Sequence, residues 1–358
     1  DFEQTVPKPR TRIHAVGRIP SQGDDYNDDD FDDGFDEEEE LEEQMFELVE
    51  MDLPVSDTHI RHFTVCNEVQ ILVTADKRVC VIDAGRSKFY TYEIASKPDD
   101  DIRKSFLCPA GVHCLLSTTN GENFYINCKE DPSSKSATVK AKRCDKLRGI
   151  EVESVGWNKY NQTNADYEKN SGAILLGTSN GQLFETRLEK DAGAKQYKVV
   201  YDFKEKANDS QAITGLEVER FPGTQSGKLL VVATTICRIY QFIGGPSFEM
   251  LFEDDMYKKS PSFQELPANN LHSELHFWHQ DLRPKTFAWI TGVGIMHGRL
   301  AFQRKAPAPP RPPTDAAEPE SVLKDSCIIP CFDSQPVGLA ISEFHFYVLY
   351  DDRMVILG

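Results

Sequence analysis

The sequence predicts an all-β fold of the β-propeller type, with a disordered acidic tail at its N-terminus. Groups of short strands recur about every fifty residues, as in propeller blades. In one group, Asn180-Gly181 separates two strand-like runs, Ala173–Thr178 and Gln182–Leu188. Asn-Gly between such runs favours a hairpin because both residues tolerate a positive φ. Val152–Trp157 and Gln196–Phe203 complete a unit of four antiparallel strands.

Residues 1–57 form the predicted tail. The segment from Ser21 to Leu53 contains seventeen Asp and Glu and no Lys or Arg. Such a block cannot bury enough apolar surface to offset the entropy of ordering. Removing it changes the net charge from −18 to −18 + 17 = −1. The remaining chain therefore offers no broad basic face, which argues against direct binding of nucleic acid or anionic lipid.

One stretch of the tail carries apolar residues at helical spacing on an acidic background. We predict a short motif that folds onto a basic, apolar groove of a partner. The alternative is a solvated tail with incidental hydrophobic residues. The predicted motif comprises Phe31, Phe35, Leu41, Met45, Leu48 and Val49.

Residues 58–358 are predicted to form the propeller, with six groups of strands visible. The sixth is in its third strand at residue 358, which would leave a sheet edge exposed. We therefore expect a truncated C-terminal end and a seven-bladed propeller in the full chain. The predicted groups are His62–Glu93, Ile102–Asn127, Glu151–Phe203, Ile213–Phe252, Glu274–Phe302 and one that begins at Pro336.

A Pro-rich loop is expected as an insertion at about residues 303–335. Arg304–Pro310 matches the Arg-x-x-Pro-x-x-Pro form that Src-homology-3 domains bind. Such matches arise easily by chance in Pro-rich sequence, and a stiff surface loop is the favoured interpretation. The loop would separate the fifth group of strands from the sixth.

Candidate catalytic and metal-binding residues give no convincing site. His272, His276 and His279 have a spacing that a helix could bring to one metal, but their segment alternates like a strand and would divide them between two faces. Cys327 and Cys331 lack a second ligand pair at zinc-site spacing. We predict no catalytic, cofactor-binding or metal-binding residues in this chain, and no enzymatic activity.

The tryptophans and cysteines have simpler expected roles. Trp157, Trp278 and Trp289 lie in strand-like runs and are expected in the core. The chain has nine cysteines, an odd number, and they are scattered along it. This pattern fits reduced thiols better than a framework of disulfides. The chain lacks an apolar run long enough to span a bilayer and a signal-like N-terminus, so a cytosolic location is expected.

An ordered set of motifs over roughly residues 60–358 resembles the N-terminal domain of the vacuolar protein sorting-associated protein 18, or deep orange, family. No single motif is specific, but their order and spacing are. The motifs are Glu153-Ser-Val-Gly-Trp-Asn158, Ile174–Glu185, Val232–Thr235, Tyr240–Gly244, Ser273–Phe277, Phe287–Trp289 and Glu343–Phe346.

The resemblance implies a propeller at the head of an α-solenoid with a C-terminal RING-type zinc domain. It implies a core subunit of the HOPS and CORVET tethering complexes, which act in SNARE-mediated fusion on the cytosolic face of late endosomes and lysosomes or the vacuole. Expected partners are other class C subunits, SNAREs and Rab-binding subunits, and zinc is expected only in the absent RING-type domain. The alternatives are a propeller from another trafficking or coat protein, or an enzyme with a site in the propeller channel.

Overall fold

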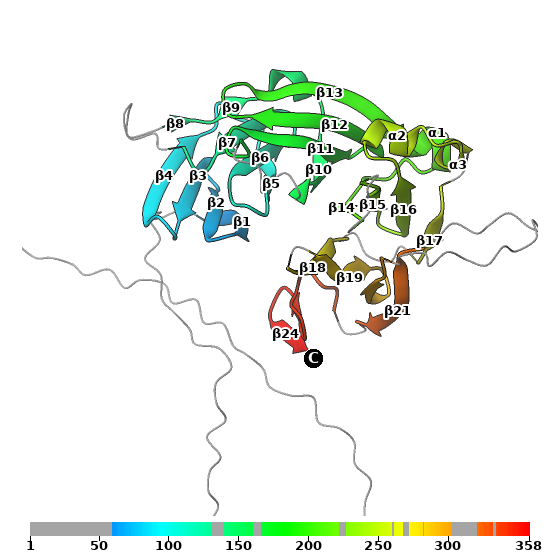
Figure 1. The fold of residues 1–358 in the computed structure, drawn as a ribbon. Coiled ribbons are helices and arrows are strands. Elements are labelled where there is room, and N and C mark those ends of the chain that lie inside the picture. The colour runs from blue at the N-terminus through cyan, green and yellow to red at the C-terminus, as the bar shows by residue number, and fades with distance from the viewer. Residues whose placement is uncertain are drawn as a thin grey trace, which may run out of the picture.

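The computed structural model describes residues 59–130, 139–159, 166–221, 227–259, 261–267, 272–281, 283–302, 321–331 and 334–358. These residues form six successive sheets, and the structure confirms the predicted all-β propeller. We call the sheets blades 1 to 6, in chain order (Figure 1).

The first three blades contain most of the long strands. Blade 1 contains β1 (Ile60–Cys66), β2 (Val69–Thr74), β3 (Arg78–Asp83), β4 (Lys88–Glu93) and β8 (Val139–Lys140). Blade 2 contains β5 (Ile102–Leu107), β6 (His113–Thr118), β7 (Asn123–Asn127) and β9 (Lys142–Arg143), followed by the 3-10 helix η1 (Asp145–Leu147). Blade 3 contains β10 (Val152–Gly156), β11 (Asn170–Thr178), β12 (Gln182–Glu189) and β13 (Gly193–Asp202).

The last three blades carry the helices described here between or within them. Helix α1 (Phe203–Ala207) precedes blade 4, which contains β14 (Gly215–Arg220), β15 (Leu229–Thr234), β16 (Arg238–Gly244) and β17 (Phe263–Glu265), with α2 (Phe248–Phe252) and α3 (Asp255–Lys259) before β17. Blade 5 contains β18 (Leu275–Gln280), β19 (Arg283–Thr291), β20 (Gly294–Leu300) and β21 (Leu323–Pro330). Blade 6 contains β22 (Gly338–Ile341), β23 (Phe346–Leu349) and β24 (Met354–Leu357).

The first strands of the blades follow the inner side of the curve in Figure 1, and the last strands lie outside. Successive first strands contact one another, from β1 and β5 through to β18 and β22. Between each pair of successive blades lies one cluster of buried apolar side chains. The apolar side chains are therefore buried between the faces of neighbouring blades and not in a single central core.

A threonine turn repeats between the second and third strands of blades 1, 2 and 3. Thr178 closes β11, and its hydroxyl accepts the backbone N–H of Gln182 at 3.0 Å while its carbonyl accepts that of Gly181 at 3.3 Å. Gly181 has φ +77°, whereas Asn180 is not left-handed. The predicted hairpin is confirmed, with the left-handed position at the glycine alone. Thr74 and Thr118 make the same two bonds in their blades.

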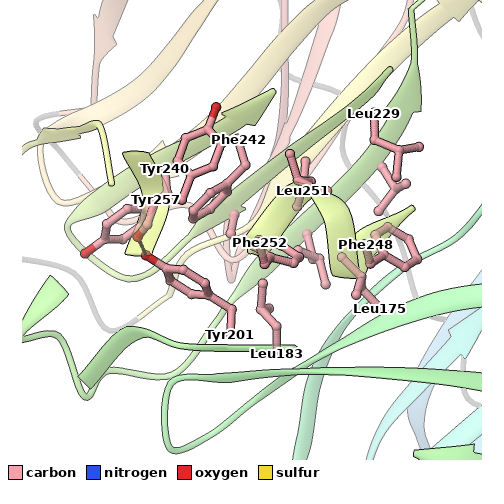
Figure 2. Packing of buried hydrophobic residues seen from close by; sticks show 14 of the residues in the cluster. Leu175, Leu183, Tyr201, Leu229, Tyr240, Phe242, Phe248, Leu251, Phe252 and Tyr257 are labelled. Carbon is pink, nitrogen blue, oxygen red and sulfur yellow. Dashed lines mark hydrogen bonds between the residues drawn. The ribbon is translucent and has the colours of Figure 1, made fainter. Parts of the chain in front are cut away.

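A helical wedge, α2 with α3, fills the space between blades 3 and 4 (Figure 2). Ser247 begins α2, and its side chain accepts the backbone N–H of Met250. Phe248, Leu251 and Phe252 turn inward and are buried. The side-chain hydroxyl of Tyr257 accepts the N–H of Ile243 at 2.6 Å and donates to the same residue's carbonyl at 3.0 Å. These contacts anchor the helices to β16.

Three details differ from the sequence expectations. Leu323–Pro330, inside the expected loop at about 303–335, forms β21 because its residues pair with β20. The end of the expected fourth group, Phe248–Phe252, is helical because its apolar residues recur at helical spacing. Blade 1 gains a fifth strand, β8, which pairs in parallel with β4 and comes from the segment after blade 2. None of the helices in the described part of the chain is long and apolar enough to cross a membrane.

Candidate interaction surfaces

Polar side chains join the inner strands from one blade to the next. Thr64 Oγ1 lies 2.8 Å from Ser105 Oγ, which links blades 1 and 2. The hydroxyl of Ser154 donates to the carbonyl of Ile213 at 2.6 Å, which links blades 3 and 4. Hydrogen bonds of this kind, partly buried at Thr64 and buried at Ser154, help to fix the angle between neighbouring sheets. Further links are Lys104 with Glu153, Thr214 with Ser273, and Glu274 with the backbone N–H of Leu339.

A charge cluster connects blades 3, 4 and 5. The Nζ atom of Lys159, just after β10, lies 2.7 Å from Glu217 Oε2 and 2.6 Å from Glu219 Oε1, both on β14. His279 Nε2 on β18 donates to the same Glu219 oxygen at 2.6 Å. Burial alone would raise the pKa of Glu219, but the Lys159 charge and the His279 hydrogen bond lower it. The cluster is a compensated set of charges that locks three blades together.

The three histidines singled out in the sequence do not share one site. His276 Nε2 lies 2.9 Å from Glu274 Oε1, and His272 Nε2 lies 3.5 Å from the other oxygen of that carboxylate, whereas His279 binds Glu219. Burial favours a higher pKa for Glu274, yet the hydrogen bonds from the two histidines lower it to about 2. No group of three or more His, Cys, Asp or Glu among the described residues is placed to hold a metal ion.

Cys327 and Cys331 also have separate partners. Cys327 Sγ lies 3.0 Å from His297 Nε2, while Cys331 Sγ lies 3.5 Å from the hydroxyl of Tyr350. All nine cysteines are free thiols. Burial raises the pKa of the Cys66 thiol to about 11, so that thiol stays protonated at neutral pH. Cys327 and Cys331 therefore share no ligand among the described residues.

Exposed apolar side chains gather on the outward faces of the first and last blades. Phe63 and Val65 of β1 are 57% and 54% exposed. Leu349 of β23 and Met354 of β24 pair with each other and are 48% and 36% exposed. On the opposite face of blade 6, Val348 is buried against blade 5. Contiguous exposed apolar side chains mark surfaces that bind another protein element.

A third surface, which we call the helical rim, consists of the outer sides of α2 and α3 with β13. Met250 on α2 is 58% exposed, and Met256 on α3 is also exposed. Lys198 of β13 forms an ion pair with Glu249, the residue before Met250, so strand and helix meet here. Flexible methionine side chains beside charges suit the docking of a partner chain.

The predicted partner motif lies outside the described residues, as does the Pro-rich match at Arg304–Pro310. Trp157 and Trp289 are buried in the core as predicted, and Trp278 is partly exposed. Sequence reasoning missed Lys159 and its two glutamates. The alternation of Glu217 and Glu219 with apolar neighbours in β14 was the one available signal, and it does not identify a partner from another blade.

Comparison with known proteins matches the chain to relatives in two animals and one plant. It is 30% identical over 317 residues to "Vacuolar protein sorting-associated protein 18 homolog" of Danio rerio, covering 82% of this chain and 30% of that protein. "Vacuolar sorting protein 18" of Arabidopsis thaliana is 29% identical over 300 residues, covering 82% and 28%. The Drosophila melanogaster "Vacuolar protein sorting-associated protein 18 homolog" is 31% identical over 282 residues, covering 71% and 26%. The chain thus spans at most 30% of the length of these relatives.

Among solved structures, the β-propeller domain of Vanderwaltozyma polyspora Nup133 superposes with a TM-score of 0.47 at 12% identity, covering 82% of this chain and 80% of that chain. This likeness is loose, and no further conclusion depends on it. The family model for the Pep3/Vps18/deep orange β-propeller domain matches residues 44–358, which include all six blades. The chain therefore belongs to the Pep3/Vps18/deep orange β-propeller family.

Proposed function

We propose that this chain is the N-terminal propeller of a core subunit of the class C tethering complexes HOPS and CORVET. It acts there as a non-enzymatic scaffold in vesicle tethering and SNARE-mediated fusion at endosomes and at lysosomes or the vacuole. The observation that carries the proposal is the family match over residues 44–358. The names of the relatives, which refer to vacuolar protein sorting, support the same process.

The geometry suits a scaffold because successive blades are fixed to each other. Hydrogen bonds and ion pairs join neighbouring inner strands, and the Lys159 cluster spans three blades. A preformed surface loses little conformational entropy when a partner binds. Loops and outer strands can therefore hold other subunits at constant relative positions.

The helical rim is the surface of the propeller that we assign to a neighbouring subunit. Met250 and Met256 project from helices whose inner sides are anchored by buried aromatic residues, so the outer methionines sit on a rigid base. Met250 and Met256 are 58% and 42% exposed, so burying the remainder against a partner contributes roughly 0.7–1.5 kcal/mol each, about half the value for a fully exposed side chain. Membrane association follows through partners such as SNAREs and Rab-binding subunits.

Co-purification of the full-length protein tests this proposal. We expect the full-length chain to recover the other class C subunits, and Met250→Asp with Met256→Asp to reduce that recovery at least threefold. Ile328→Asp, at another exposed apolar position on β21, is the matched control and should leave recovery unchanged. Circular dichroism of each variant confirms folding.

The outcomes separate the tethering assignment from its alternatives. Recovery of coat components without class C subunits would replace the proposal with another trafficking role. Full recovery by the double methionine variant would keep the tethering assignment and remove the helical rim from it.

A further inference from the structure

Four lysines on the outer strands of blades 1 to 3 have no acidic partner. Residues 139–148 contain five Lys and Arg and one Asp. Arg143 of this stretch pairs with Glu122 at 2.7 Å. The four lysines, by contrast, form no ion pair with any Asp or Glu that the structure describes. We call this group the basic patch, and it consists of Lys140, Lys142, Lys146 and Lys190.

Strand pairing brings the lysines of the basic patch together, although they come from different blades. Ala141 is buried between Lys140 and Lys142, so both lysines point to the opposite, outward side of the run. Lys142 donates to the carbonyl of Lys190, which places the turn between β12 and β13 beside β9. Lys146 lies in η1, which contacts β13. In Figure 1, β8, β9 and the start of β13 lie together on the outer side of the curve.

Few carboxylates oppose the basic patch. Asp145 and Glu189 each form an ion pair with another cation. Glu93 at the end of β4 and Asp191 in the turn before β13 remain. Arg148, exposed at the end of η1, adds a further positive charge. The basic patch therefore keeps a surplus of positive charge on a propeller that is otherwise close to neutral.

One end of the basic patch is apolar. Tyr197 and Val199 of β13 are 51% and 44% exposed. Val199 pairs with Phe184, whose ring packs between blades 2 and 3, so Val199 and Tyr197 lie on the side of β13 that faces η1. They are exposed because β9, the outer strand of blade 2, is two residues long. The whole surface follows the outer strands from blade 1 to blade 3, so a blade that closed the ring beside blade 6 would leave it uncovered.

The acidic stretch of this chain has the composition to bind that surface. Residues 24–40 contain twelve Asp and Glu and no Lys or Arg, and they also contain Tyr26, Phe31 and Phe35. They lie outside the described residues. Their carboxylates complement the lysines of the basic patch, and their aromatic rings complement its apolar end. Charge and apolar character therefore favour the same occupant.

The length of the chain allows this contact within one molecule. In blade 1, β8 lies four strand spacings from β1, a distance of about 19 Å. Nineteen residues separate Glu40 from Ile60, and they can span up to about 65 Å. Residues 24–40 therefore reach the basic patch. Attachment to the same chain also gives them a higher effective concentration there than a free partner would have.

We propose that residues 24–40 bind in cis to the basic patch, with their carboxylates on its lysines and their aromatic rings against Tyr197 and Val199. Each exposed ion pair is weak and screened by salt, so the contact depends on several pairs acting together and weakens as the salt concentration rises. Phe31 and Phe35 of the predicted partner motif belong to this stretch. The cis contact thus withholds part of that motif from a partner.

Zero-length crosslinking of the full-length protein tests the proposal. A water-soluble carbodiimide joins a lysine amine to a carboxylate in direct contact, and mass spectrometry identifies the joined peptides. Lys285 of β19 is the internal control, because it is also exposed and forms no ion pair with a described Asp or Glu. At low salt, we expect Lys142, Lys146 and Lys190 to be joined to residues 24–40 at least about tenfold more often than Lys285, and high salt should remove the difference. Mixing light and heavy isotope-labelled protein distinguishes contacts within one molecule from contacts between copies.

Equal crosslinking of Lys285 and the basic patch would overturn the proposal, because the acidic stretch would then touch any exposed lysine. Products that join only different copies, or no product with residues 24–40, would overturn it as well.

Binding in trans gives an independent measurement. Full-length protein that lacks residues 1–40 should bind a fluorescently labelled peptide of residues 21–40, as measured by anisotropy. Lys146→Glu with Lys190→Glu should weaken this binding at least about tenfold, whereas Lys285→Glu should leave it unchanged. Circular dichroism of each variant confirms folding.

Vesicles of phosphatidylcholine with phosphatidylserine separate a peptide site from a membrane site. Binding of these vesicles through the basic patch, without binding of the peptide, would overturn the proposal and assign the patch to an anionic membrane surface.

This inference does not depend on the tethering function. Failure of the crosslink leaves co-purification with class C subunits untouched, and failure of co-purification leaves the intramolecular contact untouched.

Discussion

The Nζ atom of Lys159 lies 2.6 Å from Oε1 of Glu219, a residue sixty positions later with a fully buried side chain. Glu217 and His279 complete the cluster from β14 and β18. Among the residues that the structure describes, this lysine is the one cation that contacts both glutamates. Because the cluster joins three blades, its charge balance affects the stability of the ring as a whole.

We expect Lys159→Met to destabilise the protein by roughly 3–5 kcal/mol, because a buried carboxylate loses its principal counter-charge. Urea denaturation at neutral pH measures this change in the free energy of unfolding. Lys169→Met is the matched control, since its ion pair with Asp166 is exposed, and it should change stability little.

Adding Glu219→Gln to Lys159→Met should recover part of the lost stability, because the uncompensated charge is then absent. No recovery in the double variant would mean that the lysine acts through packing rather than charge.

Acid should destabilise the protein through His113. This fully buried residue donates from Nε2 to the carbonyl of Tyr167 at 2.7 Å, and Nδ1 accepts from the hydroxyl of Tyr125 at 2.7 Å, so the ring is neutral. Burial lowers the pKa of His113 to about 4 from its ordinary 6.5. As the pH falls, His113 therefore becomes protonated in the unfolded chain before it does so in the folded protein. The stability that the neutral, buried His113 ring gives the folded state is therefore fully present above pH 6.5. It is lost between pH 6.5 and about 4, and the total loss is roughly 3 kcal/mol.

Urea denaturation of His113→Leu across this pH range measures the effect. The variant should be less stable at pH 7, because Tyr125 and Tyr167 lose a buried partner, but its stability should fall less steeply with acid. His59→Asn, at an exposed position, should retain the slope of the original protein. An unchanged slope in His113→Leu would assign the acid sensitivity to another group.

Gly181 and Gly149 offer a matched pair of left-handed glycines, with φ of +77° and +82°. A Cβ atom at Gly181 would lie 3.1 Å from the carbonyl oxygens of Asp209 and Gln211, whereas one at Gly149 would meet nothing within 4 Å. Both alanine variants should lose roughly 1–2 kcal/mol to backbone strain. Gly181→Ala should lose more stability than Gly149→Ala, and thermal denaturation of the two variants measures the difference. Equal losses would show that the turn can move away from the Asp209 segment.

The helical wedge should contribute to stability through its inner side alone. Leu251 is fully buried between blades 3 and 4, so Leu251→Ala should cost roughly 2–5 kcal/mol by leaving a cavity. Met250 is its exposed neighbour in α2, and Met250→Ala should change stability by about 0.5 kcal/mol or less. Calorimetry of both variants measures the difference. Similar losses would mean that the wedge packs less tightly than its burial indicates.

Local patterns predicted the blades well because each blade is built from neighbouring segments of the chain. Asn180-Gly181 and the apolar run before it specify a hairpin without information from other blades. The ion pair between Lys159 and Glu219 is different, since it depends on how the blades are rotated against each other. Strand β8 was also unpredictable, because two residues, Val139 and Lys140, carry too little pattern to indicate that the chain turns back to blade 1.

The return of the chain to blade 1 has a mechanical consequence. Val139–Lys140 pairs with β4, and two residues later Lys142–Arg143 pairs with β7 of blade 2. One short run of backbone is thus hydrogen-bonded to two adjacent sheets. Between its two paired segments, the N–H of Ala141 donates to the carbonyl of Glu93 at 3.1 Å. Tension applied to this run would load both sheets at once. The first two blades should therefore open together, as one cooperative unit.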